Sequence, residues 1–229
     1  KYEGAQIIMN NVRYQAGIRM KELFDLAPIG WWPVSVLPLF IRHDKAIKFS
    51  DIPNSKRVPE VVDEYIKNHS LTEIAEQVDP SYIPYEKRVK LIAAQPYVME
   101  NLPKKWFSEG FILDVINETD GYYSKDLGEF IPKEALTAPI INALIERGWL
   151  PIDRMPPVLT TTDAITKRLS RVRDDFEKEF KKIPSSKLTA SSVLEFAKIS
   201  PNAFHLIPDS LLSEPLFQVL LSYEHKTPD

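Results

Sequence analysis

The chain has 229 residues, of which 44% are hydrophobic and 27% are charged, and its formal net charge is −3. This composition is typical of a folded globular protein and excludes disordered and fibrous chains. The weak net charge disfavours a surface built throughout for nucleic acid. The absence of cysteine excludes disulfides, thiolate zinc sites and cysteine nucleophiles, and it suits a reducing compartment, so we expect a cytoplasmic protein.

Residues 1–50 are predicted to form an N-terminal helical cap. A helix over 5–25 is indicated by an apolar stripe at helical spacing, formed by Ile8, Val12, Ala16, Met20 and Leu23. The segment 26–44 that follows holds several prolines and the pair Trp31-Trp32. Its most apolar stretch, 26–41, is shorter than the ~20 apolar residues that a membrane-spanning helix needs. We therefore expect a buried, irregular segment and no transmembrane helix.

Residues 51–229 repeat a pattern that is anchored on proline. Six anchor prolines each follow an apolar residue, and we number positions from them: Pro53, Pro103, Pro132, Pro156, Pro184 and Pro208. Position +5 is a hydroxyl residue in five copies, namely Ser108, Thr137, Thr161, Thr189 and Ser213, and Val58 in the remaining copy. Mostly apolar pairs follow at +8/+9 and +12/+13. The agreement at several columns indicates internal repeats of a proline-punctuated helical chain.

The columns of this repeat have a direct physical meaning. The hydroxyl at +5 is predicted to be a helix N-cap, and the two apolar pairs, one turn apart, form a single buried face. We expect that face to include Ile141, Ile145, Leu220 and Leu221. A short second helical element precedes each anchor. Because one such unit cannot bury its face alone, the sequence predicts an all-α fold, an α-solenoid-like array of short helix pairs with an N-terminal cap.

The clearest copy, Ile207 to Phe217, has the form Ile-Pro-x-x-Leu-Leu-Ser-x-x-Leu-Phe. It resembles the short tandem helix-pair repeats of unknown function found in bacteriophage and bacterial proteins. The resemblance covers about residues 45–225 and implies a helical array, often inside a longer chain. It implies no catalytic residues. A phage or bacterial origin would suit a host-factor binder or a regulatory module.

The longest continuous helix is predicted from Asp163 to Lys182, with an apolar stripe formed by Ile165, Leu169, Val172, Phe176 and Phe180. Its basic residues are a candidate surface for phosphate or an acidic partner: Lys167, Arg168, Arg171, Arg173, Lys178, Lys181 and Lys182. The favoured alternative is a solvated helix face with i,i+4 ion pairs such as Asp174–Lys178 and Glu177–Lys181.

Trp31 and Trp32 form the second candidate binding surface, because large aromatic side chains are enriched at protein interfaces. The favoured alternative is that both belong to an irregular cap that covers the open end of the first repeat.

The sequence nominates no catalytic, cofactor-binding or metal-binding residues. The four histidines are widely separated, and phosphate-binding glycine loops and nucleophile–base pairs do not occur. We expect a non-enzymatic helical-repeat module that binds another protein. The alternatives are nucleic-acid binding through the basic helix at 167–182, or a helical domain of a larger enzyme whose active site lies outside this chain. The oligomeric state stays open.

Overall fold

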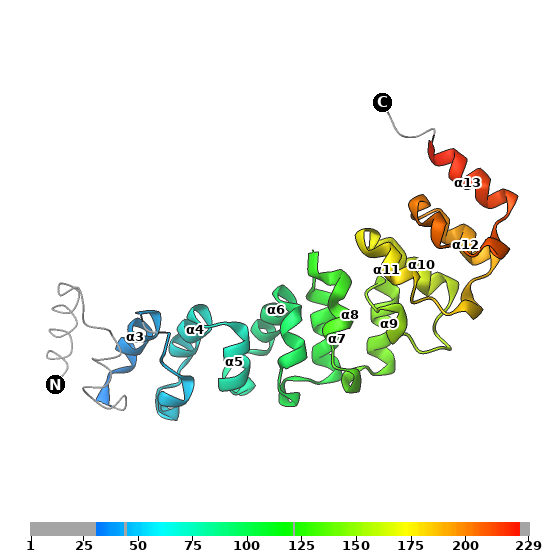
Figure 1. Cartoon of the computed structure of the whole chain (residues 1–229). Helices are drawn as coiled ribbons and strands as arrows, with labels where there is room; N and C mark the ends of the chain where they lie inside the picture. Colours follow the sequence, from blue (N-terminus) through cyan, green and yellow to red (C-terminus); the bar gives the residue numbers. More distant parts are fainter. Residues whose placement is uncertain (1–30, 44, 121, 225–229) are drawn as a thin grey trace. The chain divides into compact units, whose positions relative to one another are not determined.

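The computed structural model describes residues 31–43, 45–120 and 122–224, so the predicted helix over 5–25 lies outside the described residues. Within those ranges every regular element is an α-helix or a 3-10 helix, and no strand occurs (Figure 1). The predicted all-α class is therefore confirmed. The chain divides into two compact units, one of residues up to Leu91 with Asn101–Trp106, the other of Ile92–Glu100 with the residues from Phe107 on. The predicted division at residue 50 stays a prediction.

The first unit is built from short helices whose buried faces meet. Its elements are η2 (Val34–Val36), α3 (Leu37–His43), η3 (Phe49–Asp51), η4 (Asn54–Lys56), α4 (Pro59–Asn68), α5 (Leu71–Gln77), η5 (Pro80–Tyr82), most of α6 (Tyr85–Ala94) and η7 (Lys104–Trp106). Helix α4 packs against α3 and α5. The Arg42 guanidinium fastens α3 to α4 by two hydrogen bonds to Glu64, at 2.9 and 3.1 Å. These bonds hold the pKa of the Glu64 carboxyl below its usual value.

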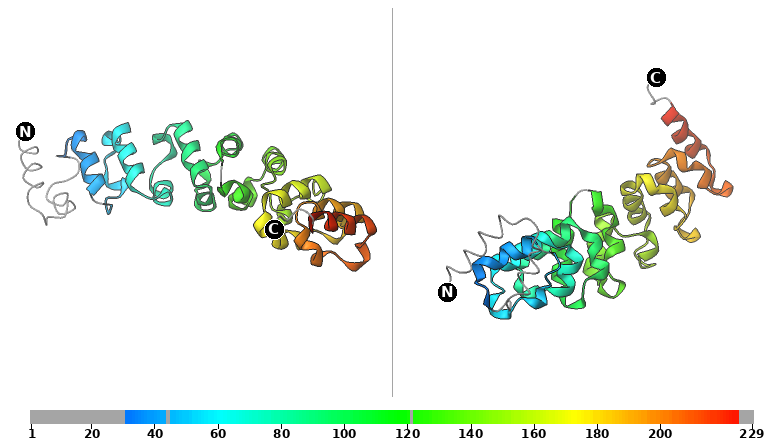
Figure 2. Two further views of the ribbon diagram at one scale, coloured as in Figure 1. Left: turned by 90° about the horizontal axis from the view of Figure 1, so that it is seen from above. Right: turned by 60° about the vertical axis from the view of Figure 1, so that its left-hand side comes forward.

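The second unit holds the remaining repeats. After most of η6 (Pro96–Asn101) come α7 (Glu109–Glu118), η8 (Tyr122–Asp126), α8 (Leu127–Phe130), η9 (Lys133–Ala135), α9 (Ala138–Arg147), η10 (Ile152–Arg154), α10 (Thr162–Arg171), η11 (Arg173–Asp175), α11 (Phe176–Phe180), η12 (Ser185–Lys187), α12 (Ala190–Ala197), η13 (Pro201–Leu206), η14 (Asp209–Leu211) and α13 (Glu214–Glu224). The longer helices of this unit contact one another in chain order: α7 with α9, α9 with α10, α10 with α12, and α12 with α13 (Figures 1 and 2).

Every anchor proline begins the same local structure. In all six copies the backbone N–H at +3 donates to the proline carbonyl oxygen at 2.8 or 2.9 Å, which closes a tight turn. The next α-helix then starts directly after position +5 in all six copies. Proline fixes its own φ and lacks an N–H, so it ends the preceding element while its carbonyl remains available to close the turn. The sequence therefore places the start of each repeated helix correctly.

The hydroxyl residue at +5 is the N-cap in four copies, as predicted, and its side chain makes the capping hydrogen bond in three of them. Ser108, Thr161 and Thr189 each accept a hydrogen bond from the backbone N–H three residues later, at 3.2 Å. Thr137 occupies the N-cap of α9 without a side-chain capping bond. Pro139 at the second position of that helix removes one of the amides that a cap would satisfy. Ser213 directly precedes α13, and its carbonyl accepts from the amides of Leu216 and Phe217.

The apolar columns form the core of most copies. The residues at +8 and +12 are buried in α4, α7, α9, α10 and α12, and those at +9 and +13 are buried in all of these helices except α9. The prediction that Ile141, Ile145, Leu220 and Leu221 are buried is wrong. The first three are half-buried, and Leu221 is exposed. In α13 the reason is that no later helix of the described chain covers its outer face.

The predicted continuous helix from Asp163 to Lys182 is also wrong. Helix α10 ends at Arg171, because Val172 leaves helical geometry with φ −109° and ψ 44°, and α11 starts at Phe176 after a 3-10 turn. The apolar stripe is nevertheless buried on both sides of this break. Residues eleven positions apart on a straight helix lie ~16 Å apart along its axis. The break instead brings Arg168 and Glu179, which are that far apart in sequence, within hydrogen-bond distance.

Candidate functional site

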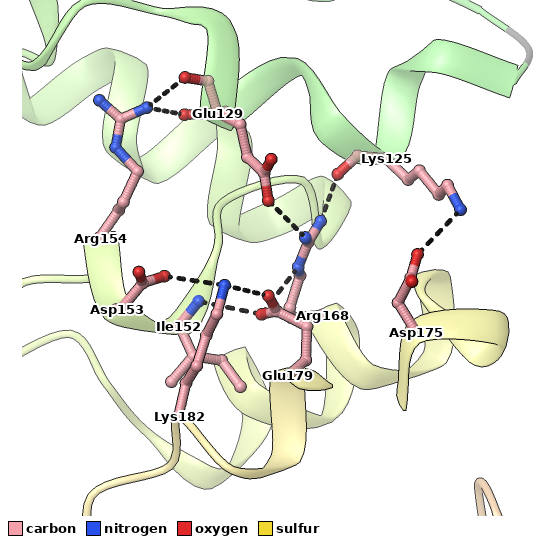
Figure 3. Close-up of polar contacts among 10 residues, drawn as sticks. Lys125, Glu129, Ile152, Asp153, Arg154, Arg168, Asp175, Glu179 and Lys182 are labelled. Carbon is pink, nitrogen blue, oxygen red and sulfur yellow. Dashed lines mark hydrogen bonds and ion pairs between the residues drawn. The ribbon is translucent and has the colours of Figure 1, made fainter. Parts of the chain in front are cut away.

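Charged side chains gather in the second unit around Arg168 and Glu179, which are 1% and 2% exposed (Figure 3). We call these two residues and the charged residues paired with them the Glu179 cluster: Glu129, Asp153 and Lys182. Arg168 occupies position +12 of its copy, where the other copies carry an apolar residue. Its Nε donates to Glu179 Oε2 at 3.2 Å, across the break between α10 and α11. The terminal nitrogens of Arg168 reach η8 and α8, where one donates to the carbonyl of Lys125 and the other lies 3.8 Å from Glu129 Oε1.

Glu179 accepts from three donors at once. Besides Arg168, the Lys182 ammonium lies 2.6 Å from Oε1, and the backbone N–H of Ile152 donates to Oε2 at 3.3 Å. Lys182 also pairs with Asp153 at 3.2 Å. Burial alone raises the pKa of Glu179, but the hydrogen bonds and charges of Lys182 and Arg168 outweigh it, so the pKa lies below its usual value.

Burial and hydrogen bonding also have opposite effects on the pKa of Lys182. Burial lowers the pKa of Lys182, but its hydrogen bonds to Glu179 and Asp153 raise the pKa above its ordinary value overall. At neutral pH both partners are therefore charged. A carboxylate that already accepts three hydrogen bonds is a weak acceptor for a substrate proton. The hydrogen bonds and ion pairs of the cluster instead join η8, α8, η10, α10 and α11 to one another.

Arg154 strengthens the same region by binding the end of α8. Its guanidinium donates to the carbonyl oxygens of Gly128, of Glu129 at 2.9 Å and of Ile131 at 2.8 Å. The last carbonyls of a helix have no partner within the helix, and a cation there also matches the helix dipole. Burial lowers the pKa of Arg154, and the neighbouring acidic residues oppose this shift.

Two glycines permit close backbone approaches around the cluster. A Cβ on Gly128 of α8 would lie 2.5 Å from the carbonyl oxygen of Trp149. Gly148 ends α9 with φ 67°, and a Cβ there would lie 2.4 Å from the carbonyl oxygen of Lys167 on α10. Only glycine fits such contacts without moving backbone, and the positive φ adds to this requirement at Gly148.

The structure does not gather the predicted basic residues into one open surface. Lys167 and Lys181 are exposed and pair with Asp163 at 2.9 Å and Glu177 at 2.7 Å, both one turn away. Lys182 is half-buried in the Glu179 cluster. Arg171 is exposed, and its Nε donates to the carbonyl of Arg147 at 3.2 Å. Lys178 is exposed, and the Arg173 side chain lies outside the described part of the structure.

The two tryptophans have different environments, although the sequence treats them as a pair. Trp32 is 7% exposed and meets the ring of Phe40 edge-on, with ring centroids 5.0 Å apart. Trp31 is 79% exposed. Trp32 therefore belongs to the core of the first unit, and only Trp31 presents its ring to solvent.

Sequence reasoning missed the Glu179 cluster. The one signal was Arg168 itself, a charged residue in a column that is otherwise apolar, which calls for a buried partner. Residues 31–43, 45–120 and 122–224 contain no group of histidines and carboxylates arranged to hold a metal ion. No helix in these ranges has the length and apolar character needed to cross a bilayer. Comparisons of the chain with protein-family models, curated proteins and solved structures gave no match.

Proposed function

We propose that the chain is a non-catalytic helical-repeat module that binds another protein through the solvent-facing side of its repeated helices. One observation carries the proposal. Position +14 is exposed and polar in all six copies, while its chemistry differs from copy to copy: Lys67, Asn117, Glu146, Ser170, Lys198 and Ser222. Position +7, seven residues earlier and on the same face, is also exposed in every copy. We call these two columns the +7/+14 face.

The chemistry of this face favours a protein partner over nucleic acid. Nucleic-acid binding depends on cations that neutralise successive phosphates. Position +14 carries two cations, one anion and three neutral side chains. A varied polar surface of this kind supplies specific hydrogen bonds and complementary charges, which is how protein interfaces select their partners.

The proposal includes a solenoid-like stacking of the repeats. Its support is that α7, α9, α10, α12 and α13 contact one another in chain order within the second unit. Stacked repeats of this type bury their apolar faces against each other and leave an extended surface for a partner. The resemblance of the Ile-Pro repeat to bacteriophage and bacterial helix-pair repeats makes a cytoplasmic host-factor or regulatory partner our working hypothesis.

A pair of charge-matched variants tests this face. The face variant combines Glu146→Lys, Ser170→Glu and Lys198→Glu, all at +14. The control variant combines Lys133→Glu, Glu134→Lys and Ser210→Glu, which are exposed residues of the 3-10 turns after the anchors. Both triples change the net charge equally. We expect a protein captured by the wild-type chain to be retained by the control variant and lost by the face variant, with unchanged circular dichroism.

The nucleic-acid alternative has its own test. Reversing Arg171 and Lys178 to Glu changes two exposed cations of the basic segment. We expect no salt-sensitive RNA or DNA binding by the wild-type chain, and therefore no effect of the double reversal. Tight binding to an oligonucleotide that weakens steeply with salt and disappears in the double variant would replace our proposal with nucleic-acid recognition.

A further inference from the structure

His69 follows helix α4, and both nitrogens of its imidazole ring face carbonyl oxygens. Nδ1 lies 3.0 Å from the carbonyl oxygen of Tyr65, one turn earlier on α4. Nε2 lies 3.2 Å from the carbonyl oxygen of Lys45, on the segment 45–48 that precedes η3. A carbonyl oxygen only accepts hydrogen bonds, and a neutral imidazole has a single N–H. A neutral ring in this position would therefore turn a lone pair toward one of the two oxygens, and only the imidazolium ion donates to both.

The surroundings of the ring favour a cation. His69 is the C-cap residue of α4, where the helix dipole stabilises positive charge. Its ring stacks on the Tyr65 ring, with centroids 3.7 Å apart and planes 9° apart, and an aromatic face attracts a cation. On α5, hydrogen bonds from Ser70 lower the pKa of the Glu73 carboxyl, and the charges of His69 and Lys45 lower it further. Glu73 thus offsets the like charge that the Lys45 ammonium brings to this position.

Other charged groups on the elements around His69 have partners of their own. On α3, which packs against α4, Arg42 binds Glu64. On η3, Asp51 accepts a hydrogen bond from the backbone N–H of Lys48 at 3.0 Å. The structure therefore sets the α5 carboxylate against the imidazolium ion.

We propose that His69 is a pH-dependent link, which holds the segment 45–48 against the C-terminal end of α4 when its ring carries both protons and releases the segment when the ring is neutral. The bond to Lys45 joins residues 24 positions apart, beyond the reach of helix hydrogen bonds. The same segment leads to Phe49, whose ring meets the Tyr65 ring edge-on with centroids 5.2 Å apart. The His69 link therefore sets how firmly the start of the first repeat is held, and it does not depend on the proposed protein partner.

The direction of the pH effect follows from proton binding. The unfolded chain has no carbonyl oxygens fixed at both ring nitrogens, so the folded chain holds the second ring proton more firmly. The state that binds more protons is favoured as pH falls. The His69 link therefore stabilises this part of the first unit at about pH 5.5 and is lost by about pH 8, the range over which histidine changes charge.

Amide hydrogen exchange of the full chain tests the link. The Phe49 amide donates to Gln77 Oε1 at 3.0 Å, so its protection reports whether the segment is held in place. We expect its protection factor, which corrects for the pH dependence of intrinsic exchange, to fall ~5-fold from about pH 5.5 to about pH 8, the change expected for one hydrogen bond. In His69→Gln, whose side chain does not titrate, the factor should be the same at both pH values. His43→Gln is the matched control, because His43 is an exposed histidine of the same unit, and it should behave like the wild-type chain.

The wild-type measurement alone is decisive if His69→Gln fails to fold. An unchanged protection factor for Phe49 in the wild-type chain would overturn the proposal. So would an equal fall in His69→Gln, or loss of the pH dependence in His43→Gln. The Leu144 amide, buried in α9 of the second unit, is the internal reference, and an equal fall there would show a general loss of stability instead of release of the link.

Discussion

Replacing Glu179 by Ala should be among the most destabilising single changes in the second unit. The substitution removes the close carboxylate partner of a guanidinium that is 1% exposed. Arg168 keeps its hydrogen bond to the Lys125 carbonyl, and among the described carboxylates it keeps Glu129, at 3.8 Å and on a side chain that is 40% exposed. It also removes the acceptor of the Ile152 amide, whereas Lys182 keeps Asp153 at 3.2 Å. Breaking a buried ion pair from one side typically costs ~3–5 kcal/mol, and we expect a loss in that range.

Urea unfolding followed by circular dichroism measures this loss as a shift of the midpoint at constant slope. Glu177→Ala is the matched control on the same helix, because Glu177 pairs with Lys181 at 2.7 Å on the exposed side of α11. We expect a far smaller effect there, since exposed ion pairs contribute little. Replacing both members of the buried pair, Arg168→Met with Glu179→Leu, should cost less than Glu179→Ala alone, because no buried charge is left unpaired. Equal effects of Glu177→Ala and Glu179→Ala would refute the reasoning.

Three further predictions concern caps, glycine and pH. Thr161→Ala should destabilise by ~1 kcal/mol in urea unfolding and Thr137→Ala by less, because only Thr161 makes a capping bond; equal losses would contradict this. Gly148→Ala should destabilise strongly, whereas Gly110→Ala should be neutral or stabilising, because the Gly110 site is open and helical. The lowered pKa of Glu179 adds stability that is present above the unfolded-state value of about 4.3 and is lost as pH falls toward the folded pKa. Glu179→Gln should therefore lose less stability than the wild-type chain between about pH 5 and pH 3, measured by urea unfolding at each pH.

The local parts of the fold were predictable because they depend on few neighbouring residues. The apolar-proline pair ends one element, the next three residues form a turn, and the helix starts after +5 even where Val58 replaces the hydroxyl. These features follow from the fixed φ of proline and the geometry of a tight turn. Thr137 lies at the N-cap but makes no capping hydrogen bond, because the residue type at the N-cap does not by itself ensure that the bond forms.

The features that the sequence did not predict depend on contacts between distant segments. Val172, Phe176 and Phe180 continue the apolar stripe of α10 at helical spacing, and this pattern predicts one helix. The three side chains are buried on both sides of the break, so the apolar pattern does not reveal the break. The break brings Arg168 and Glu179 into contact over eleven residues, a separation beyond the i,i+4 range of helix rules. Burial also depends on which neighbour is present, and so Leu221 is exposed although its column is apolar.

The most direct test of the proposed function is the affinity of a captured protein for three purified chains: wild type, the +14 face variant and its charge-matched control variant. Our account predicts binding at least ~10-fold weaker for the face variant, equivalent to ~1.4 kcal/mol, and unchanged for the control variant. Equal affinity of all three chains for that protein would contradict the claim that the +7/+14 face is the binding surface.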